Sequence, residues 1–352
     1  MIAPLNDETE PEVRPGAHPL RALRTRNFKL FFFGQFISLI GTWMQNTALP
    51  LLVIQLAPDH PGEALGLVNF VPLIPLVPLV LIVGSLADRF SRRKLVILAQ
   101  IVMMLTAFTL AYLTLTQQIQ IWHIFALIMA NGIGNAIDTP SRQAFMVDML
   151  EDRSDLGSAV ALNSSIFNLG RALGPVIAGF LIAPLGFGAA FLINGLSFLA
   201  VIIGLLLIHI PPQPPRDRQP NLGTHLSEGL RYVWQNQSVL ILMSLVAVSA
   251  FLSTPFLTLM PLFVQAPNGS LAATAQPIND LICSRIVCQT ADAIPFGLLM
   301  GAFGLGALVG ALLVGAKTDR LRGRWLTLGN LGFPMALIVF AVSRSFWLSF
   351  AV

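Results

Sequence analysis

The stretch Gly84-Ser85-Leu86-Ala87-Asp88-Arg89-Phe90-Ser91-Arg92-Arg93-Lys94 joins two apolar runs and contains a glycine, an Asp-Arg pair and a basic cluster, in that order. A shorter version recurs far downstream as Gly315-Ala316-Lys317-Thr318-Asp319-Arg320-Leu321-Arg322-Gly323-Arg324. In both copies the glycine lies four residues before the Asp-Arg pair, and the basic residues follow where an apolar run meets polar sequence. Two copies of one loop predict a chain built from two similar halves.

The composition excludes an ordinary soluble fold. Hydrophobic residues make up 55% of the chain and charged residues only 11%, and the mean hydropathy is +0.74. Soluble domains carry about 25% charged residues. The 21 Lys and Arg residues lie in short loops between apolar runs rather than on one basic face. We therefore expect a lipid bilayer as the partner of this chain and no nucleic acid.

Nine apolar runs predict membrane-spanning helices, because a span needs about 20 apolar residues and lipid offers no partner for exposed backbone groups. The runs are Leu30–Gln55, Leu65–Ala87, Leu95–Thr116, Ile121–Ile137, Ser158–Ala183, Phe187–Ile210, Val239–Gln265, Pro295–Gly315 and Leu326–Val342. A tenth run begins near Phe346 and ends with the chain at Val352. The predicted fold class is all-α integral membrane.

The basic residues set the expected orientation, since short cytoplasmic loops hold the excess of Lys and Arg. Nearly all of them fall in the N-terminal segment or in every second loop after it, whereas the opposite loops hold only Arg285 and Arg344. The N-terminus is therefore predicted to be cytoplasmic. The first 20 residues are acidic and lack an apolar core, so we expect no cleavable signal peptide.

Four segments describe the expected organisation: a cytoplasmic N-terminal segment at 1–29, a six-helix bundle at 30–210, a cytoplasmic linker at 211–238 and an incomplete second bundle at 239–352. The linker begins with the proline-rich stretch 211–220, which cannot continue a helix. After it, apolar residues at helical spacing predict an amphipathic helix, which lies either on the cytoplasmic membrane surface or against the inner face of the protein.

The second bundle carries a long polar loop at 266–294, predicted to lie outside the cytoplasm. This loop holds Cys283 and Cys288, the only cysteines of the chain. Outside the cytoplasm, two cysteines so close in sequence form either a small disulfide or two inert thiols.

Arg171 lies in the middle of the fifth apolar run, where a charge costs about 2.5 to 3.5 kcal/mol on insertion scales. No Asp or Glu lies in the middle of an apolar run, so its partner is a polar side chain, a backbone carbonyl, water or the transported molecule. We expect Arg171 to face a central cavity. The residues expected to line this cavity are Gln45, Asn46, Asn131, Asn135, Asn163, Asn168 and Arg171.

The loop at Gly84–Lys94 and its repeat resemble the signature loops of the major facilitator superfamily of transporters. The resemblance implies two six-helix bundles, of which this chain holds about nine helices and the start of a tenth, so we expect a C-terminally truncated copy rather than a natural ten-helix protein. It also implies that these loops hold one conformation together. The residues implied in this gating role are Gly84, Asp88, Arg89, Arg92, Arg93, Gly315, Asp319 and Arg320.

The fifth run resembles the glycine-proline motif of the antiporter branch of that superfamily. Its glycines and Ala178 recur at four-residue spacing, which lets a neighbouring backbone approach closely, and Pro175 bends the helix. The residues of this motif are Gly170, Arg171, Gly174, Pro175 and Gly179.

Three further segments look like the branch that includes the enterobactin exporter and macrolide efflux proteins. They are Arg26–Phe31, Gly34–Gln45 and Asp138–Phe145. In the last of them, Asp138 and Arg142 are expected to exchange ion pairs with the Asp88 loop during transport.

The resemblance implies a secondary-active efflux transporter in the plasma membrane, the inner membrane of a bacterium. It would export a small amphipathic molecule, drug-like or siderophore-like, by alternating access. Its second partner would be a proton or another coupling ion, with proton antiport as the expected energy source. We expect no cofactor and no metal, and the sequence holds no phosphate-binding loop for ATP. The alternatives are a non-functional fragment of such a transporter, a membrane enzyme or a receptor.

Overall fold

The computed structural model describes residues 20–76, 79, 91–150, 152–209, 231–265, 269–315 and 319–352. Helices are the only regular elements in these ranges. They are η1 (Arg21–Arg24), α1 (Arg26–Leu56), α2 (Pro61–Phe70), α4 (Arg92–Leu115), α5 (Ile121–Asp148), η2 (Arg153–Asp155), α6 (Leu156–Leu207), α8 (Gln237–Val264), α9 (Ala272–Cys283), α10 (Ala293–Gly315), α11 (Asp319–Val342) and α12 (Phe346–Ala351).

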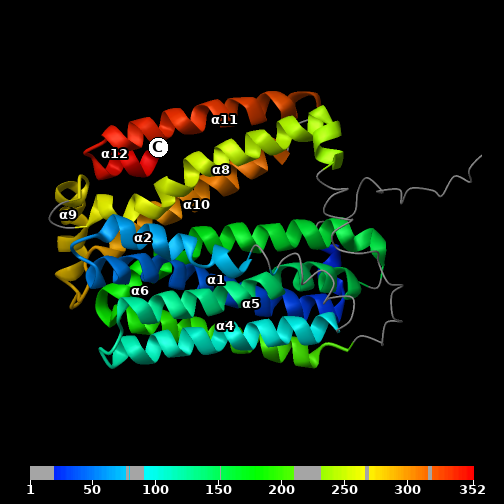
Figure 1. Ribbon diagram of the computed structural model, residues 1–352, viewed down its shortest axis with the longest axis horizontal. Helices are drawn as coiled ribbons and strands as arrows, with labels where there is room; N and C mark the ends of the chain where they lie inside the picture. The colour runs from blue at the N-terminus through cyan, green and yellow to red at the C-terminus, as the bar shows by residue number, and fades with distance from the viewer. Residues whose placement is uncertain are drawn as a thin grey trace, which may run out of the picture.

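The long helices form two bundles that lie side by side. Helices α1, α2, α4, α5 and α6 make the first bundle, and α8, α10, α11 and α12 make the second (Figure 1). Within the described ranges, α1, α4, α6, α8 and α10 are long and apolar enough to cross a membrane. The predicted all-α membrane fold with two halves is confirmed.

Helix α6 covers two of the predicted spans. It runs for 52 residues and is broken at Gly186, which has a φ of 74°. A positive φ is a conformation that glycine adopts without the steric cost paid by other residues. The break falls between the predicted runs Ser158–Ala183 and Phe187–Ile210, so the two runs are two arms of one kinked element.

Several helices extend beyond their apolar runs. Helix α5 was expected to end at Ile137 but continues to Asp148. Asp138 therefore lies inside a helix, with more than two further turns of α5 after it. Helix α11 likewise begins at Asp319 rather than Leu326. Hydropathy marks the stretch that lipid requires, whereas backbone hydrogen bonding continues the helix into the polar layer.

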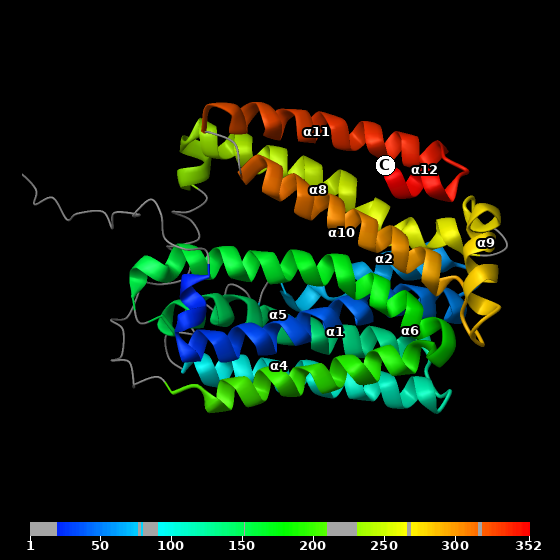
Figure 2. The same ribbon diagram turned by 180° about the vertical axis from the view of Figure 1, so that it is seen from behind.

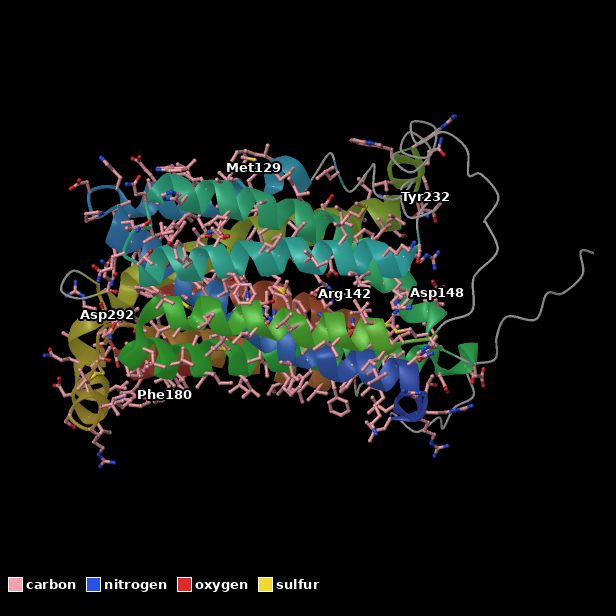
Figure 3. The ribbon with its side chains drawn as sticks, turned by 90° about the horizontal axis from the view of Figure 1, so that it is seen from below. Met129, Arg142, Asp148, Phe180, Tyr232 and Asp292 are labelled. Atoms are coloured by element: carbon pink, nitrogen blue, oxygen red, sulfur yellow. A yellow bond between two sulfur atoms is a disulfide. The ribbon has the colours of Figure 1, made fainter. Side chains whose placement is uncertain are left out.

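The predicted polar loop at 266–294 contains a helix of its own. Helix α9 lies across one end of the molecule, beside the ends of both bundles (Figure 2). We call this end the α9 end. Asp292 lies near it, whereas Arg142 and Asp148 lie toward the opposite end (Figure 3).

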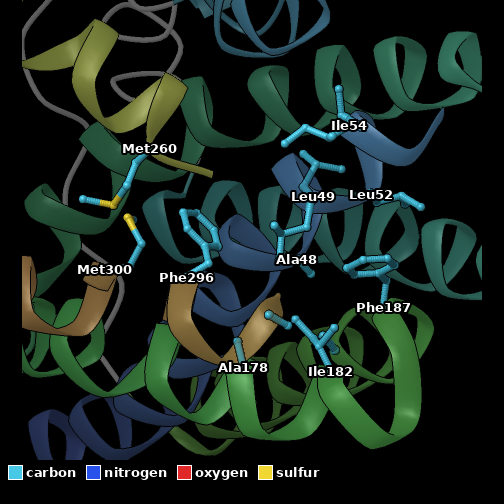
Figure 4. Packing of buried hydrophobic residues seen from close by; sticks show 14 of the residues in the cluster. Ala48, Leu49, Leu52, Ile54, Ala178, Ile182, Phe187, Met260, Phe296 and Met300 are labelled. Carbon is cyan, nitrogen blue, oxygen red and sulfur yellow. The ribbon is translucent and has the colours of Figure 1, made fainter. Parts of the chain in front are cut away.

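One apolar core joins the two bundles near the α9 end. Ala178 and Ile182 of α6 pack in the same cluster as Phe296 and Met300 of α10 (Figure 4). All four side chains are buried. A second cluster, which includes Phe28, Phe145 and Met149, belongs to the first bundle alone. The two bundles are thus held together mainly at one end.

Candidate functional site

Glycines of α10 form the contact between the bundles. Adding a Cβ atom to Gly301 would place it 3.0 Å from the carbonyl oxygen of Ala172, and a Cβ on Gly304 would come within 2.5 Å of the carbonyl oxygen of Arg171. On the facing helix, a Cβ on Gly179 would lie 2.6 Å from the carbonyl oxygen of Ala293. Only residues without a side chain allow two helix backbones to come this close.

The contact between α6 and α10 ends after Gly304. Ala311, about two helical turns beyond Gly304 on the same face of α10, is exposed, and the two helices diverge toward this end (Figure 1). Farther along α10, the side chain of Leu312 is 65% exposed. The bundles therefore touch over the half of α10 next to the α9 end and separate over its other half.

The antiporter-type motif faces two neighbours. A Cβ on Gly170 would lie 3.2 Å from the ring of Trp43, and one on Gly174 would lie 3.2 Å from the carbonyl oxygen of Ile40, so these two glycines pack against α1. Gly179 and Pro175 instead pack against α10, where Gly297 approaches both. The motif joins the first bundle internally and also seals it against the second.

Arg171 lies where the two bundles separate. One terminal nitrogen of its guanidinium donates to Oδ1 of Asn168 at 3.1 Å, and the group lies over the ring of Phe303 at 5.7 Å from the centroid. A cation over an aromatic face is attracted by the negative potential of the ring. The sequence analysis named Asn168 among the candidate neighbours but missed Phe303, which comes from the other half of the chain.

The structure does not bring all the expected cavity residues together. Gln45 is buried and accepts a hydrogen bond from Asn194 at 2.8 Å inside the first bundle. In this conformation the amide of Gln45 serves a contact between α1 and α6. Asn46 is exposed, and Asn163 is partly buried.

Two other candidates form a pair on α5. Asn135 donates to Oδ1 of Asn131 at 2.7 Å, and Asn131 in turn reaches Oγ1 of Thr106 on α4 at 3.4 Å. Asn135 is exposed and Asn131 is partly buried. This pair is separate from the Arg171–Asn168 pair on α6.

A cavity of about 400 Å³ lies inside the second bundle among α8, α10, α11 and α12. Five phenylalanines line part of its wall: Phe256, Phe303, Phe333, Phe340 and Phe350. Phe256 and Phe340 meet edge to face at 4.8 Å. The sequence analysis missed this cluster. The seven-residue spacing of Phe333 and Phe340, two helical turns, was the signal that could have found part of it.

The gating loop lies partly outside the described residues, including Gly84, Asp88 and Arg89. Arg92, at the start of α4, forms an ion pair with Asp148, in which one terminal guanidinium nitrogen lies 2.9 Å from each carboxylate oxygen. Arg93 donates to the carbonyl oxygen of Leu206 at 2.9 Å. Asp148 was missed because it lies 56 residues from Arg92 in sequence. In the second copy, Gly315 ends α10 and the pair Asp319–Arg320 begins α11.

The two residues of the expected switch already form an ion pair with each other. Nε of Arg142 lies 3.0 Å from Oδ2 of Asp138, and Gln100 donates to Oδ1 of the same carboxylate at 3.0 Å. Asp138 is 3% exposed. Its neighbours are thus drawn from α4 and α5, so the carboxylate links these two helices.

Cys283 and Cys288 form a disulfide. The bond joins the last residue of α9 to the segment that leads into α10. Of the two alternatives for these cysteines, the structure has the bonded one.

The geometry agrees with comparisons to solved transporters. A bacterial homolog of the human lysosomal transporter Spinster, solved in an inward-facing and unoccupied conformation, superposes with a TM-score of 0.67 at 15% identity. It covers 94% of this chain and 71% of its own. A peptide transporter superposes with a TM-score of 0.53 at 14% identity, over 95% of this chain and 82% of its own. These likenesses show the fold.

Sequence relatives give the family. The staphyloferrin A transporter of Staphylococcus aureus is 31% identical over 182 residues, which are 51% of this chain and 45% of the relative. Macrolide efflux protein A of Streptococcus pyogenes is 23% identical over 79% of this chain and 68% of its own length. The enterobactin exporter of Citrobacter koseri is 24% identical over 90% of this chain and 70% of its own. The chain thus spans about half to 70% of these relatives.

A family model described as transmembrane secretion effector matches residues 17–276, most of the chain. The relatives named above are a staphyloferrin transporter, a macrolide efflux protein and an enterobactin exporter. The chain therefore belongs to the transmembrane secretion effector family of the major facilitator superfamily.

Proposed function

We propose that this protein exports a small amphipathic molecule from the cytoplasm by alternating access between two bundles. The observation that carries the proposal is the α6–α10 contact, which is close from Gly179 to Gly304 and is lost toward the other end of α10, where Ala311 and Leu312 are exposed. Two bundles that touch at one end and separate at the other can expose a site between them to one side of a membrane at a time.

The side to which the site opens follows from the charges. The basic residues Arg92 and Arg93 lie at the end opposite α9, where Asp148 binds one of them. Short loops rich in Lys and Arg remain in the cytoplasm. With the N-terminus proposed to lie in the cytoplasm, the closed α9 end would face outward and this conformation would be inward-open.

The cargo is proposed to be neutral or anionic, with an apolar part. Arg171 places a positive charge where the bundles separate, and Phe303 beneath it offers an aromatic face. In a low-dielectric setting, a permanent cation near an arginine would be repelled. Siderophores and macrolides, named for the relatives, are the first cargo to test.

The gating role is proposed for the loop at Gly84–Lys94 and its repeat at 315–324. Arg92 already ties the start of α4 to the end of α5 through Asp148. Asp88 and Arg89 would extend this network across the cytoplasmic face, with Asp138 and Arg142 as the partners that change. Proton antiport is the proposed energy source.

Reconstitution in vesicles tests the proposal. The chain should move a macrolide or a siderophore out of loaded proteoliposomes when an inwardly directed proton gradient is imposed, and Asp88→Asn should reduce this flux at unchanged insertion. Asp59→Asn, in the turn after α1, is the matched control. If no tested cargo moves faster than in protein-free vesicles, the result supports a non-functional fragment. If flux does not depend on the proton gradient, proton antiport is wrong.

A further inference from the structure

A strap crosses the α9 end of the molecule and is hydrogen-bonded to both bundles. We define the strap as residues 269–290, which include α9 and the disulfide. It lies across both bundles, with α12 at one of its ends and α6 at the other (Figure 2). The proposed function gives no role to this segment.

The first part of the strap is fixed to the second bundle. Thr274 Oγ1 donates to the carbonyl oxygen of Arg344 at 3.1 Å and accepts from the backbone N–H of Phe346 at 3.0 Å, so it bonds to the turn between α11 and α12. Leu271 and Ala275 are buried in the core cluster that joins the bundles. This part therefore moves with the second bundle.

The last part of the strap binds the first bundle through one backbone oxygen. The N–H groups of Gln289 and Thr290 both donate to the carbonyl oxygen of Ala183, at 2.6 and 3.3 Å. Ala183 ends the first arm of α6, just before the kink at Gly186. Carbonyl groups at a helix end lack regular helical partners and take donors from elsewhere. Here the donors come from the other bundle.

The disulfide connects these two attachments. Cys283 is the last residue of α9, and Cys288 immediately precedes Gln289. Because the bond closes a short loop, it limits the conformations available to residues 284–287. Because α9 is fixed, the disulfide also restrains the positions of the two N–H groups that bind Ala183.

We propose that the strap is an outer latch, in which the Cys283–Cys288 bond holds Gln289 and Thr290 on Ala183 and thereby favours the inward-open state. The proposal rests on alternating access. To open outward, α6 and α10 must part beside Gly179, and the two hydrogen bonds to Ala183 must break. A broken disulfide leaves the donors free to move, so the outward-open state becomes more populated. No redox reaction in the cell is required.

A buried reporter cysteine measures that population. Ile182 is 0% exposed in the core between the bundles, so Ile182→Cys should react with a membrane-impermeant maleimide added outside only after outward opening. In proteoliposomes, adding Cys283→Ser and Cys288→Ser should raise the labelling rate several-fold over the reporter alone. Gln289→Pro, which deletes the shorter hydrogen bond, should do the same with the disulfide intact.

Val287→Pro is the matched control. Val287 lies in the same small loop and is 86% exposed, so its substitution should leave the labelling rate unchanged. Equal rates in the reporter, the double serine and the Gln289→Pro proteins would overturn the latch. A rate raised equally by Val287→Pro would overturn the assignment of the latch to the Ala183 bonds. Cargo flux, read in the same vesicles, tests export separately: faster labelling without any flux supports the latch and contradicts the proposed export.

Discussion

The guanidinium of Arg171 lies 5.7 Å from the ring centroid of Phe303, so a charge of the first bundle rests on an aromatic ring of the second. The two residues are 132 positions apart and meet where α6 and α10 separate. A charge in the middle of a spanning helix needs a stabilising partner. This partner belongs to the bundle that would move away in the proposed alternating-access cycle, so in that cycle the contact would couple the charge to the conformational change.

Removing the charge should change cargo preference. Arg171→Gln is expected to lower export of an anionic substrate more than that of a neutral substrate of similar size, because only the anion is attracted by the guanidinium. Paired flux measurements in proteoliposomes give the ratio. Equal loss for both substrates would reassign Arg171 to packing or gating, and efficient export of a quaternary ammonium dye by the unaltered protein would contradict the charge argument.

Removing the aromatic ring of Phe303 should lower flux through its effect on Arg171. A cation–π contact contributes about 0.5 to 2 kcal/mol, so Phe303→Leu should reduce flux of the anionic substrate by about 2- to 30-fold. Phe350→Leu is the matched control, since Phe350 lines the same cavity and its ring packs on Phe346 and Trp347. If both leucine variants lose flux equally, the effect belongs to the cavity wall and not to the cation–π contact.

Side chains added at the bundle contact should prevent the closed end from forming. Gly301→Leu places its side chain against the Ala172 carbonyl and Val176, and we expect a loss of flux of more than tenfold at normal insertion. Gly310→Leu, farther along α10, enters open space outside the aromatic cavity and should retain flux. Similar flux from the two variants would mean that the α6–α10 contact is not needed for transport.

The ion pair between Arg92 and Asp148 should stabilise the first bundle. Their side chains are only 14% and 10% exposed, and removal of one member of such a pair typically costs about 3 to 5 kcal/mol. Arg92→Gln should therefore lower the melting temperature in detergent, and the double variant Arg92→Gln with Asp148→Asn should recover part of the loss. Arg93→Gln is the control, since the Arg93 side chain donates to a backbone carbonyl oxygen rather than to a carboxylate. A double variant less stable than either single one would argue against direct pairing.

The orientation predicts which side of the membrane the disulfide faces. After mild reduction, Cys283 and Cys288 should react with a membrane-impermeant thiol reagent added to intact cells from which the outer membrane or cell wall has been removed. All labelling can be assigned to this pair, since these are the only cysteines of the chain. Reaction that requires access from the cytoplasmic side would reverse the charge-based orientation.

The sequence by itself determined the class of the protein and the course of its helices. Because a helix that crosses lipid must be long and apolar, the apolar runs of the sequence indicate where the helices lie. The kink at Gly186 accordingly falls between two predicted runs. The paired loop signature and the glycine-proline motif gave the superfamily. Polar helix ends were less predictable, because helices α5 and α11 continue where lipid no longer demands apolar residues.

Only the tertiary structure decided which residues meet. Gln45 accepts a hydrogen bond from Asn194. Arg92 forms an ion pair with Asp148, and Arg171 lies over the ring of Phe303. Spacing along a helix predicts which face a residue occupies but not the helix that will cover that face. The bonds from Gln289 and Thr290 to Ala183 leave no trace in the sequence at all, because they join backbone groups that every residue type except proline could supply.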